Sequence, residues 1–236
     1  MTLSRRGLFA APALATSVVA STVAAQPQST PQGDSIFADF IGPQFDPEHD
    51  HRNAAIGTGS PLHDEIAVAV RLLLGAGKYD HHLDVARYFQ NIKERNIQGE
   101  PYNREWSKRG NPLITGLFSM TQTLPAKGDE TPWCAAFVSF CLYAAGRPTQ
   151  RTARARDYVG YRNQARTSDP RPGDLAVFKR NEADGHVGFF TRWQTNAAGA
   201  RTGKFMVLGG NQSDGVSEAA YPTAKTALIG FYRVDD

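Results

Sequence analysis

Four side chains in the second half of the chain could carry nucleophilic chemistry: Cys134, Cys141, His186 and Asn211. A cysteine attacks a carbonyl group when a neighbouring base accepts its proton and a third polar group orients that base. His186 begins an apolar run that is typical of a core strand, whereas the five other histidines fall in loops or on helix surfaces. His186 is therefore the best candidate for the base, and Asn211, which follows two glycines at the end of another strand, for the orienting group.

The two cysteines fall within one predicted helix, residues 132–145, and are seven residues apart. On a continuous helix this spacing gives a rise of about 10.5 Å, whereas a disulfide needs Cα atoms within about 7 Å. We therefore expect two free thiols. Cys141 lies among apolar residues and is expected in the core. Cys134 follows Pro132 in the first turn, where the helix dipole lowers a thiol pKa and unpaired N–H groups can hold an oxyanion.

Each of these residues also has a purely structural interpretation. By position alone, Cys134 is as compatible with a core residue as with a nucleophile. His186 could be a hydrogen-bonded histidine at a strand edge, and Asn211 a turn residue. Trp133 and Trp193 could line a cleft and contact a substrate, although aromatic residues are more often part of the core.

The surrounding pattern predicts the elements that position these residues. Apolar residues at helical spacing predict four helical segments, at residues 61–75, 85–92, 111–118 and 132–145. Short apolar runs between turn residues predict four strands, at 175–178, 186–192, 205–208 and 227–234. Helices followed by strands indicate an α+β fold. The segment 147–171 holds seven arginines against two aspartates. Such a run is usually a solvated helix face, and it could also meet an anionic polymer.

The N-terminal region predicts export. Residues 1–25 combine Arg5 and Arg6, an uncharged apolar stretch and small residues before a cut after Ala25, as in a signal peptide. The arginine pair favours the twin-arginine type, and the apolar stretch is too short for a membrane anchor. Residues 26–60 are rich in Pro, Gly, Ser and Asp and are interpreted as a flexible linker.

Charge and ligand patterns argue against two classes of partner. The chain has 26 Lys and Arg against 23 Asp and Glu, but two of the arginines lie in the predicted signal, which leaves 24 against 23. This balance gives no support to nucleic-acid binding. His49 and His51 lie among acids in the linker, but no other strong ligand cluster accompanies them, so we expect no metal site.

Four segments in fixed order resemble the CHAP-type amidohydrolases and peptidases of the NlpC-like, papain-like superfamily. They are Thr131–Val138 (TPWCAAFV), Pro172–Phe178 (PGDLAVF), Gly185–Phe189 (GHVGF) and Leu208–Gln212 (LGGNQ). The order is specific, although each motif alone is weak. The resemblance implies a papain-like NlpC/CHAP fold, with helices packed on a small antiparallel sheet. It also implies Cys134 as nucleophile, His186 as base and Asn211 as a third polar residue. Some members carry a glutamate two residues before that asparagine, where this chain has Gly209.

The resemblance implies that residues 61–236 form a CHAP-like catalytic domain that cleaves an amide or peptide bond in peptidoglycan through a thiol acyl-enzyme. No cofactor is required, and we expect an exported monomer, periplasmic or secreted, without a membrane anchor after signal cleavage. Two other functions stay open. One is a non-catalytic wall-binding module, and the other is a cysteine acyl-transfer enzyme with another exported substrate, because a fold does not define a substrate.

Overall fold

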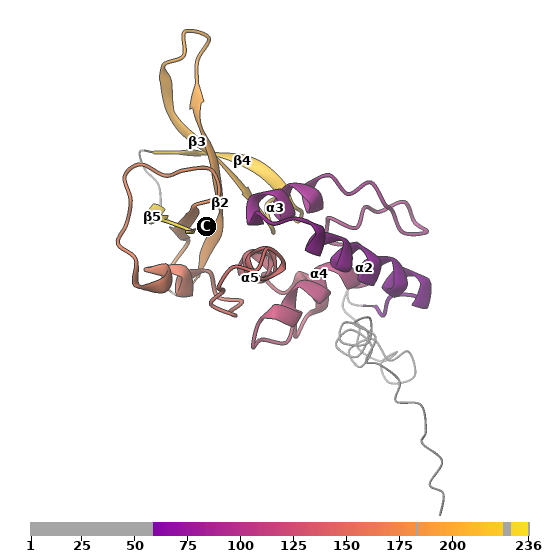
Figure 1. Ribbon diagram of the computed structural model, residues 1–236. Coiled ribbons are helices and arrows are strands. Elements are labelled where there is room, and N and C mark those ends of the chain that lie inside the picture. The colour runs from indigo at the N-terminus through magenta and orange to yellow at the C-terminus, as the bar shows by residue number, and fades with distance from the viewer. Residues whose placement is uncertain (1–58, 183, 224–227, 236) are drawn as a thin grey trace, which may run out of the picture. The chain divides into compact units, whose positions relative to one another are not determined.

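The computed structural model describes residues 59–182, 184–223 and 228–235. The predicted signal peptide, nearly all of the predicted linker and the histidines near residue 50 lie outside these ranges. Within the described part of the chain, helices come first and strands second (Figure 1). The predicted α+β class is confirmed.

The helical half is built from α2 to α5, which lie where the apolar periodicity predicts them. Their bounds are α2 His63–Gly75, α3 His82–Gln90, α4 Pro112–Gly116 and α5 Cys134–Ala144. Short 3-10 turns join them or follow them: η2 Ala76–Lys78, η3 Leu117–Met120, η4 Gly128–Glu130, η5 Ala155–Tyr158 and η6 Tyr161–Asn163. The arginine-rich segment contains two short 3-10 helices and no α-helix. The expected continuous helix face is therefore wrong, whereas most of its arginines are exposed, as expected for a solvated segment.

The five strands form one antiparallel sheet in the order β4-β3-β2-β1-β5. Their bounds are β1 Leu175–Lys179, β2 Gly185–Thr195, β3 Arg201–Gly209, β4 Ser217–Pro222 and β5 Leu228–Tyr232. The sequence predicts all of them except β4. That strand lies at the edge of the sheet and has no fully buried residue, so it lacks the apolar run that signals a core strand.

Helix α5 lies between the sheet and the other helices (Figure 1) and packs against β2, α3 and η3. Its residues from Cys134 to Leu142 are all buried, as expected for a helix that is apolar on every side. The main core joins these helices to one face of the sheet through Val177, Val187 and Phe189. The other face carries a separate aromatic cluster with Phe178, Phe190, Phe205 and Phe231.

Both cysteines are free and buried, so the prediction from helical spacing is confirmed. In the described residues, no helix is both long enough and apolar enough to span a bilayer.

Candidate active site

Cys134 is the first residue of α5, and only 5% of its surface is exposed. Backbone N–H groups of Val187, Ala135 and Cys134 itself lie within hydrogen-bonding range of the sulfur and favour its anionic form. The N–H groups of the first helical turn have no carbonyl partner inside the helix. The sulfur therefore lies among donors that could hold a developing oxyanion.

The sulfur reaches a strand backbone because β2 and β3 separate here. The β2–β3 pairing begins at Phe189, whereas residues 185–188 pair with β1 alone. The turn after β3 passes close to the start of α5, since a Cβ on Gly210 would lie 2.4 Å from the Trp133 ring. The glycine thus permits the close backbone approach expected from the sequence. The N-terminus of α5 consequently meets the free edge of β2.

Two contacts, one partly buried and one fully buried, fix the segment that leads into α5. The indole Nε1 of Trp133 donates a hydrogen bond of 2.8 Å to Oε1 of Glu105. One carboxylate oxygen of Asp129 accepts from the backbone N–H groups of Trp106, at 3.0 Å, and Asn111, at 2.9 Å. Burial raises the pKa of Asp129 to about 7, against the opposing effect of these two donors. Asn111 also caps α4, where it accepts from the N–H of Leu113.

The two tryptophans that could line a cleft have other surroundings. Trp133 is completely buried and packs edge-on against Phe137. Trp193 joins the aromatic cluster on the other face of the sheet, with the Arg201 guanidinium 4.4 Å from its ring centre. Neither lines the cavity at Cys134, so their role in substrate binding stays a prediction.

His186 lies on β2, next in sequence to Val187, and is 2% exposed. Its ring lies 6.0 Å from that of Phe178 and is stacked at 6.1 Å on that of Tyr221. Burial is the main cause that lowers its pKa to about 4, and the charge of Arg180 adds to it. Neither ring nitrogen has a hydrogen-bond partner within the described chain, the Cys134 sulfur included. The structure thus brings the imidazole to the strand that meets the thiol, without a formed bond between them.

The amide side chain that makes contacts beside His186 is that of Gln212, not that of Asn211. The Gln212 side chain favours the protonated imidazole, although its alignment is not that of a formed hydrogen bond. Its Nε2 donates to the carbonyl oxygens of Val207, at 3.3 Å, and Ser217. Its Oε1 accepts from the Tyr221 hydroxyl at 2.8 Å.

Asn211 lies at a turn with φ of 55° and is half-buried. None of the side-chain hydrogen bonds described in this region involves it, so its orienting role stays a prediction. The sequence offered two adjacent amides, and nothing in it indicated which one would point inward. Tyr221 could not be found because it lies on the unpredicted strand β4.

The electrostatics of the site differ from the expectation for a helix N-terminus. Burial raises the pKa of the Cys134 thiol above its ordinary value, and this outweighs the lowering by the backbone donors and Arg180. The expectation that the dipole yields a lowered thiol pKa is therefore wrong for the resting protein. Since the pKa of His186 is lowered, both side chains are neutral near pH 7. The arrangement favours proton transfer during attack over a preformed thiolate–imidazolium pair.

A cavity of about 360 Å³ opens at Cys134. Three segments line it: the start of α5, the loop before η5 and the β1–β2 turn. The lining residues are Pro132, Cys134, Ala153, Arg154, Ala155, Arg180, Asn181, Asp184 and Gly185. Its charged groups are thus two arginines and one aspartate, which suits an anionic ligand. Among the described residues, no three His, Cys, Asp or Glu side chains gather in a metal-binding arrangement.

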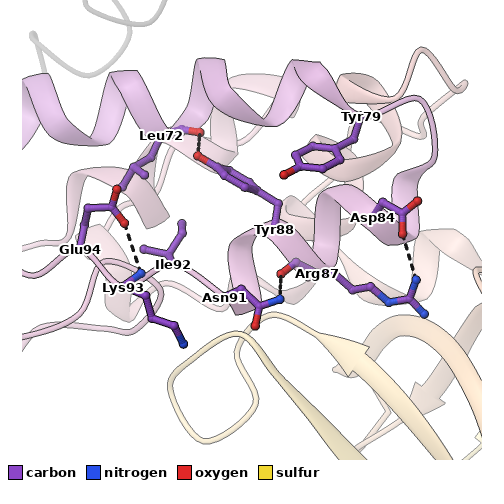
Figure 2. A pocket seen from close by; sticks show the side chains of 9 residues that line it. All are labelled: Leu72, Tyr79, Asp84, Arg87, Tyr88, Asn91, Ile92, Lys93 and Glu94. Atoms are coloured by element: carbon purple, nitrogen blue, oxygen red, sulfur yellow. Dashed lines mark hydrogen bonds and ion pairs between the residues drawn. The ribbon is translucent and has the colours of Figure 1, made fainter.

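A larger cavity of about 880 Å³ lies between α2 and α3 (Figure 2). Its polar groups satisfy one another: the Tyr88 hydroxyl donates to the Leu72 carbonyl at 3.0 Å, and Arg87 pairs with Asp84 at 2.9 Å. No cysteine or histidine lines it. It therefore lacks a thiol and an imidazole, and the smaller cavity at Cys134 is the candidate active site.

Comparison with protein families gives one match: residues 126–211 match the family model of the CHAP domain. The matched range begins shortly before α5 and includes Cys134, His186 and Asn211. It ends one residue before Gln212. Neither the curated proteins nor the solved structures gave a match.

Proposed function

We propose that this chain is an exported cysteine hydrolase of the bacterial cell wall, because residues 126–211 match the model of the CHAP domain and such domains are typically hydrolases that act on peptidoglycan. It cleaves an amide or peptide bond of peptidoglycan, as an amidase at the sugar–peptide junction or as an endopeptidase within the stem peptide. Cys134 is the nucleophile and His186 the acid–base residue.

One observation carries this proposal. The cysteine that borders the cavity at α5 has its sulfur among three backbone N–H groups. One of these belongs to Val187, which directly follows a buried histidine without a hydrogen-bond partner in the described chain. A buried imidazole of this kind is costly unless a ligand or a reaction uses it. A nucleophile, a base and an oxyanion site therefore lie within one small region.

The proposed reaction starts from the neutral pair. The Cys134 sulfur attacks the carbonyl carbon while the His186 imidazole takes the thiol proton, and the N–H groups of Ala135 and Val187 hold the oxyanion. The imidazolium then gives its proton to the leaving nitrogen as the C–N bond breaks, which leaves a thioester. Water adds to this thioester as His186 takes its proton, and the C–S bond breaks to restore the thiol.

We assign the orienting role to Gln212 and not to Asn211. The Gln212 amide is fixed by its own donors and by the Tyr221 hydroxyl, so it is held in one orientation beside the ring. Catalytic hydrogen bonds often tighten when substrate binds, so we expect the bond between this amide and the imidazole to form in the substrate complex.

Digestion of purified peptidoglycan tests the activity. Wild-type protein should release fragments with new amine and carboxyl ends, and Cys134→Ala should release none. Mass analysis of the fragments distinguishes an amidase from an endopeptidase. Cys141→Ala is the matched control, because that thiol is completely buried in the core and is expected to leave the cleavage products unchanged.

The alternatives predict different outcomes. A wall-binding module would sediment with peptidoglycan and release nothing, in wild type and Cys134→Ala alike. An acyl-transfer enzyme would also leave peptidoglycan intact, yet would form a thioester at Cys134 with its own substrate. Export through a twin-arginine signal belongs to the same proposal, and it rests on residues 1–25, outside the described chain. Replacing Arg5 and Arg6 by Lys should retain the protein in the cytoplasm.

A further inference from the structure

The cavity at Cys134 carries positive charge that the protein itself does not neutralise. Arg180 makes no ion pair with any described residue, although several exposed arginines elsewhere do, among them Arg87 and Arg192. Arg154 has one partner, Asp157, at the long distance of 4.0 Å, and both side chains are exposed. Such an exposed pair contributes little.

The single carboxylate in the cavity lining is already engaged. Asp184 accepts a hydrogen bond of 2.6 Å from the Asn181 amide, and its backbone N–H in turn donates to the Asn181 side chain. This closes the β1–β2 turn locally and explains why both residues lie there. The guanidinium groups of Arg154 and Arg180 therefore remain available to a ligand.

Arg180 is also close to the reacting groups. Its charge acts on the Cys134 thiol, the His186 imidazole and the Tyr221 hydroxyl. A lone cation at this position opposes protonation of His186, which the proposed reaction requires. An anion bound at Arg180 would remove that opposition at the moment when substrate fills the cavity.

We propose that Arg180, assisted by Arg154, binds a carboxylate of the substrate beside the scissile bond. The substrate class is therefore a peptide that carries a free carboxylate close to the cleaved amide. Planar guanidinium groups match carboxylates with two parallel hydrogen bonds, which gives orientation as well as affinity. This inference rests on the proposed function, because it concerns the substrate of the same site.

The test compares soluble stem-peptide fragments of peptidoglycan with the same fragments after their carboxylates are converted to carboxamides. Wild type should cleave the carboxylate form with a KM lower by about tenfold, as expected for a charge-assisted bidentate contact. In Arg180→Gln this preference should disappear through a higher KM for the carboxylate form. Arg180→Lys should keep part of this preference, since a lysine retains the positive charge but cannot form the two parallel hydrogen bonds of a guanidinium group.

Arg201→Gln serves as the matched control, because it removes one exposed arginine from β3 outside the cavity. It should keep the wild-type preference. If Arg180→Gln lowers the rates on both substrate forms by the same factor, the arginine acts on Cys134 or His186 and not on the substrate, and the proposal is overturned.

A binding measurement separates this proposal from the hydrolase proposal. If wild type cleaves neither form, the hydrolase proposal fails, but calorimetry with the same two fragments still tests Arg180. Tighter binding of the carboxylate form by wild type, lost in Arg180→Gln, would support the site. Equal binding of both forms by wild type would refute it.

Discussion

The lowered pKa of His186 makes a quantitative prediction about stability. An unfolded histidine has its ordinary pKa of 6.5, and burial lowers the folded value to about 4. Between pH 6.5 and 4 the unfolded chain therefore binds a proton at this histidine that the folded chain does not bind, so folding stability falls as the pH falls towards 4. Linkage gives a loss of about 2 kcal/mol between pH 7 and pH 5 from this one group.

Replacing His186 by glutamine should remove this loss. Urea unfolding at pH 7 and pH 5 gives the free energy of unfolding of wild type and of His186→Gln at each pH. Whatever the stability of the variant at pH 7, its decrease on going to pH 5 should be smaller than that of wild type by about 2 kcal/mol. Because other groups titrate in the same range, only the difference between the two decreases is used.

His63→Gln is the matched control, since it removes an exposed histidine from the first turn of α2. The reasoning would be refuted if His186→Gln and wild type lost equal stability between pH 7 and pH 5. That result would mean that the folded protein accepts a proton at His186 as readily as the unfolded chain. The neutral resting pair proposed for catalysis would then be wrong as well.

Three further predictions concern the same region. Gln212→Ala should lower kcat on peptidoglycan by about tenfold or more. Asn211→Gly should change kcat by no more than about threefold, because glycine readily adopts a φ of 55°. A larger loss of kcat in the Asn211 variant would restore Asn211 as the orienting residue. The rate of alkylation of Cys134 by iodoacetamide should rise about tenfold per pH unit from pH 7 to 9, with Cys134→Ala as control. A rate that is already independent of pH below pH 7 would instead indicate a thiolate–imidazolium pair. The pKa of Asp129 is raised from 3.8 in the unfolded chain to about 7 in the folded protein. Its preference for the proton in the folded state therefore contributes fully to folding stability below pH 3.8, and this contribution is lost as the pH rises through 7. Asp129→Asn should therefore cancel a loss of about 2 to 3 kcal/mol that wild type shows between pH 5 and 8 in urea unfolding.

Local patterns in the sequence predict the helices, four of the strands and the free state of both cysteines, because periodicity and spacing are properties of short segments. They do not predict which of two adjacent amides points inward. That choice depends on the left-handed conformation of Asn211 and on carbonyl groups of β3 and β4 that hold Gln212. Strand β4 itself has only half-buried and exposed residues, so it carries no apolar signal.

The direction in which the thiol pKa is shifted also depends on tertiary structure. A helix N-terminus lowers the pKa of an accessible thiol, and the sequence shows where that terminus lies. It does not show that β2 and the cavity walls bury Cys134 to 5% exposure. Desolvation then outweighs the donors around the sulfur. Arg180 likewise has no motif of its own, since it enters the site only because the β1–β2 turn lies beside α5.

These features together imply that substrate activates the site. Burial raises the pKa of the thiol and lowers that of the imidazole to about 4, so moving the proton from sulfur to ring in the resting protein requires free energy. Two groups are arranged to reduce this requirement. The N–H groups at the start of α5 stabilise negative charge once a carbonyl is attacked, and a substrate carboxylate at Arg180 would cancel the charge that opposes the imidazolium. In this view, the buried neutral pair reacts slowly with small electrophiles in solution and reaches full activity only with a substrate that fills the cavity.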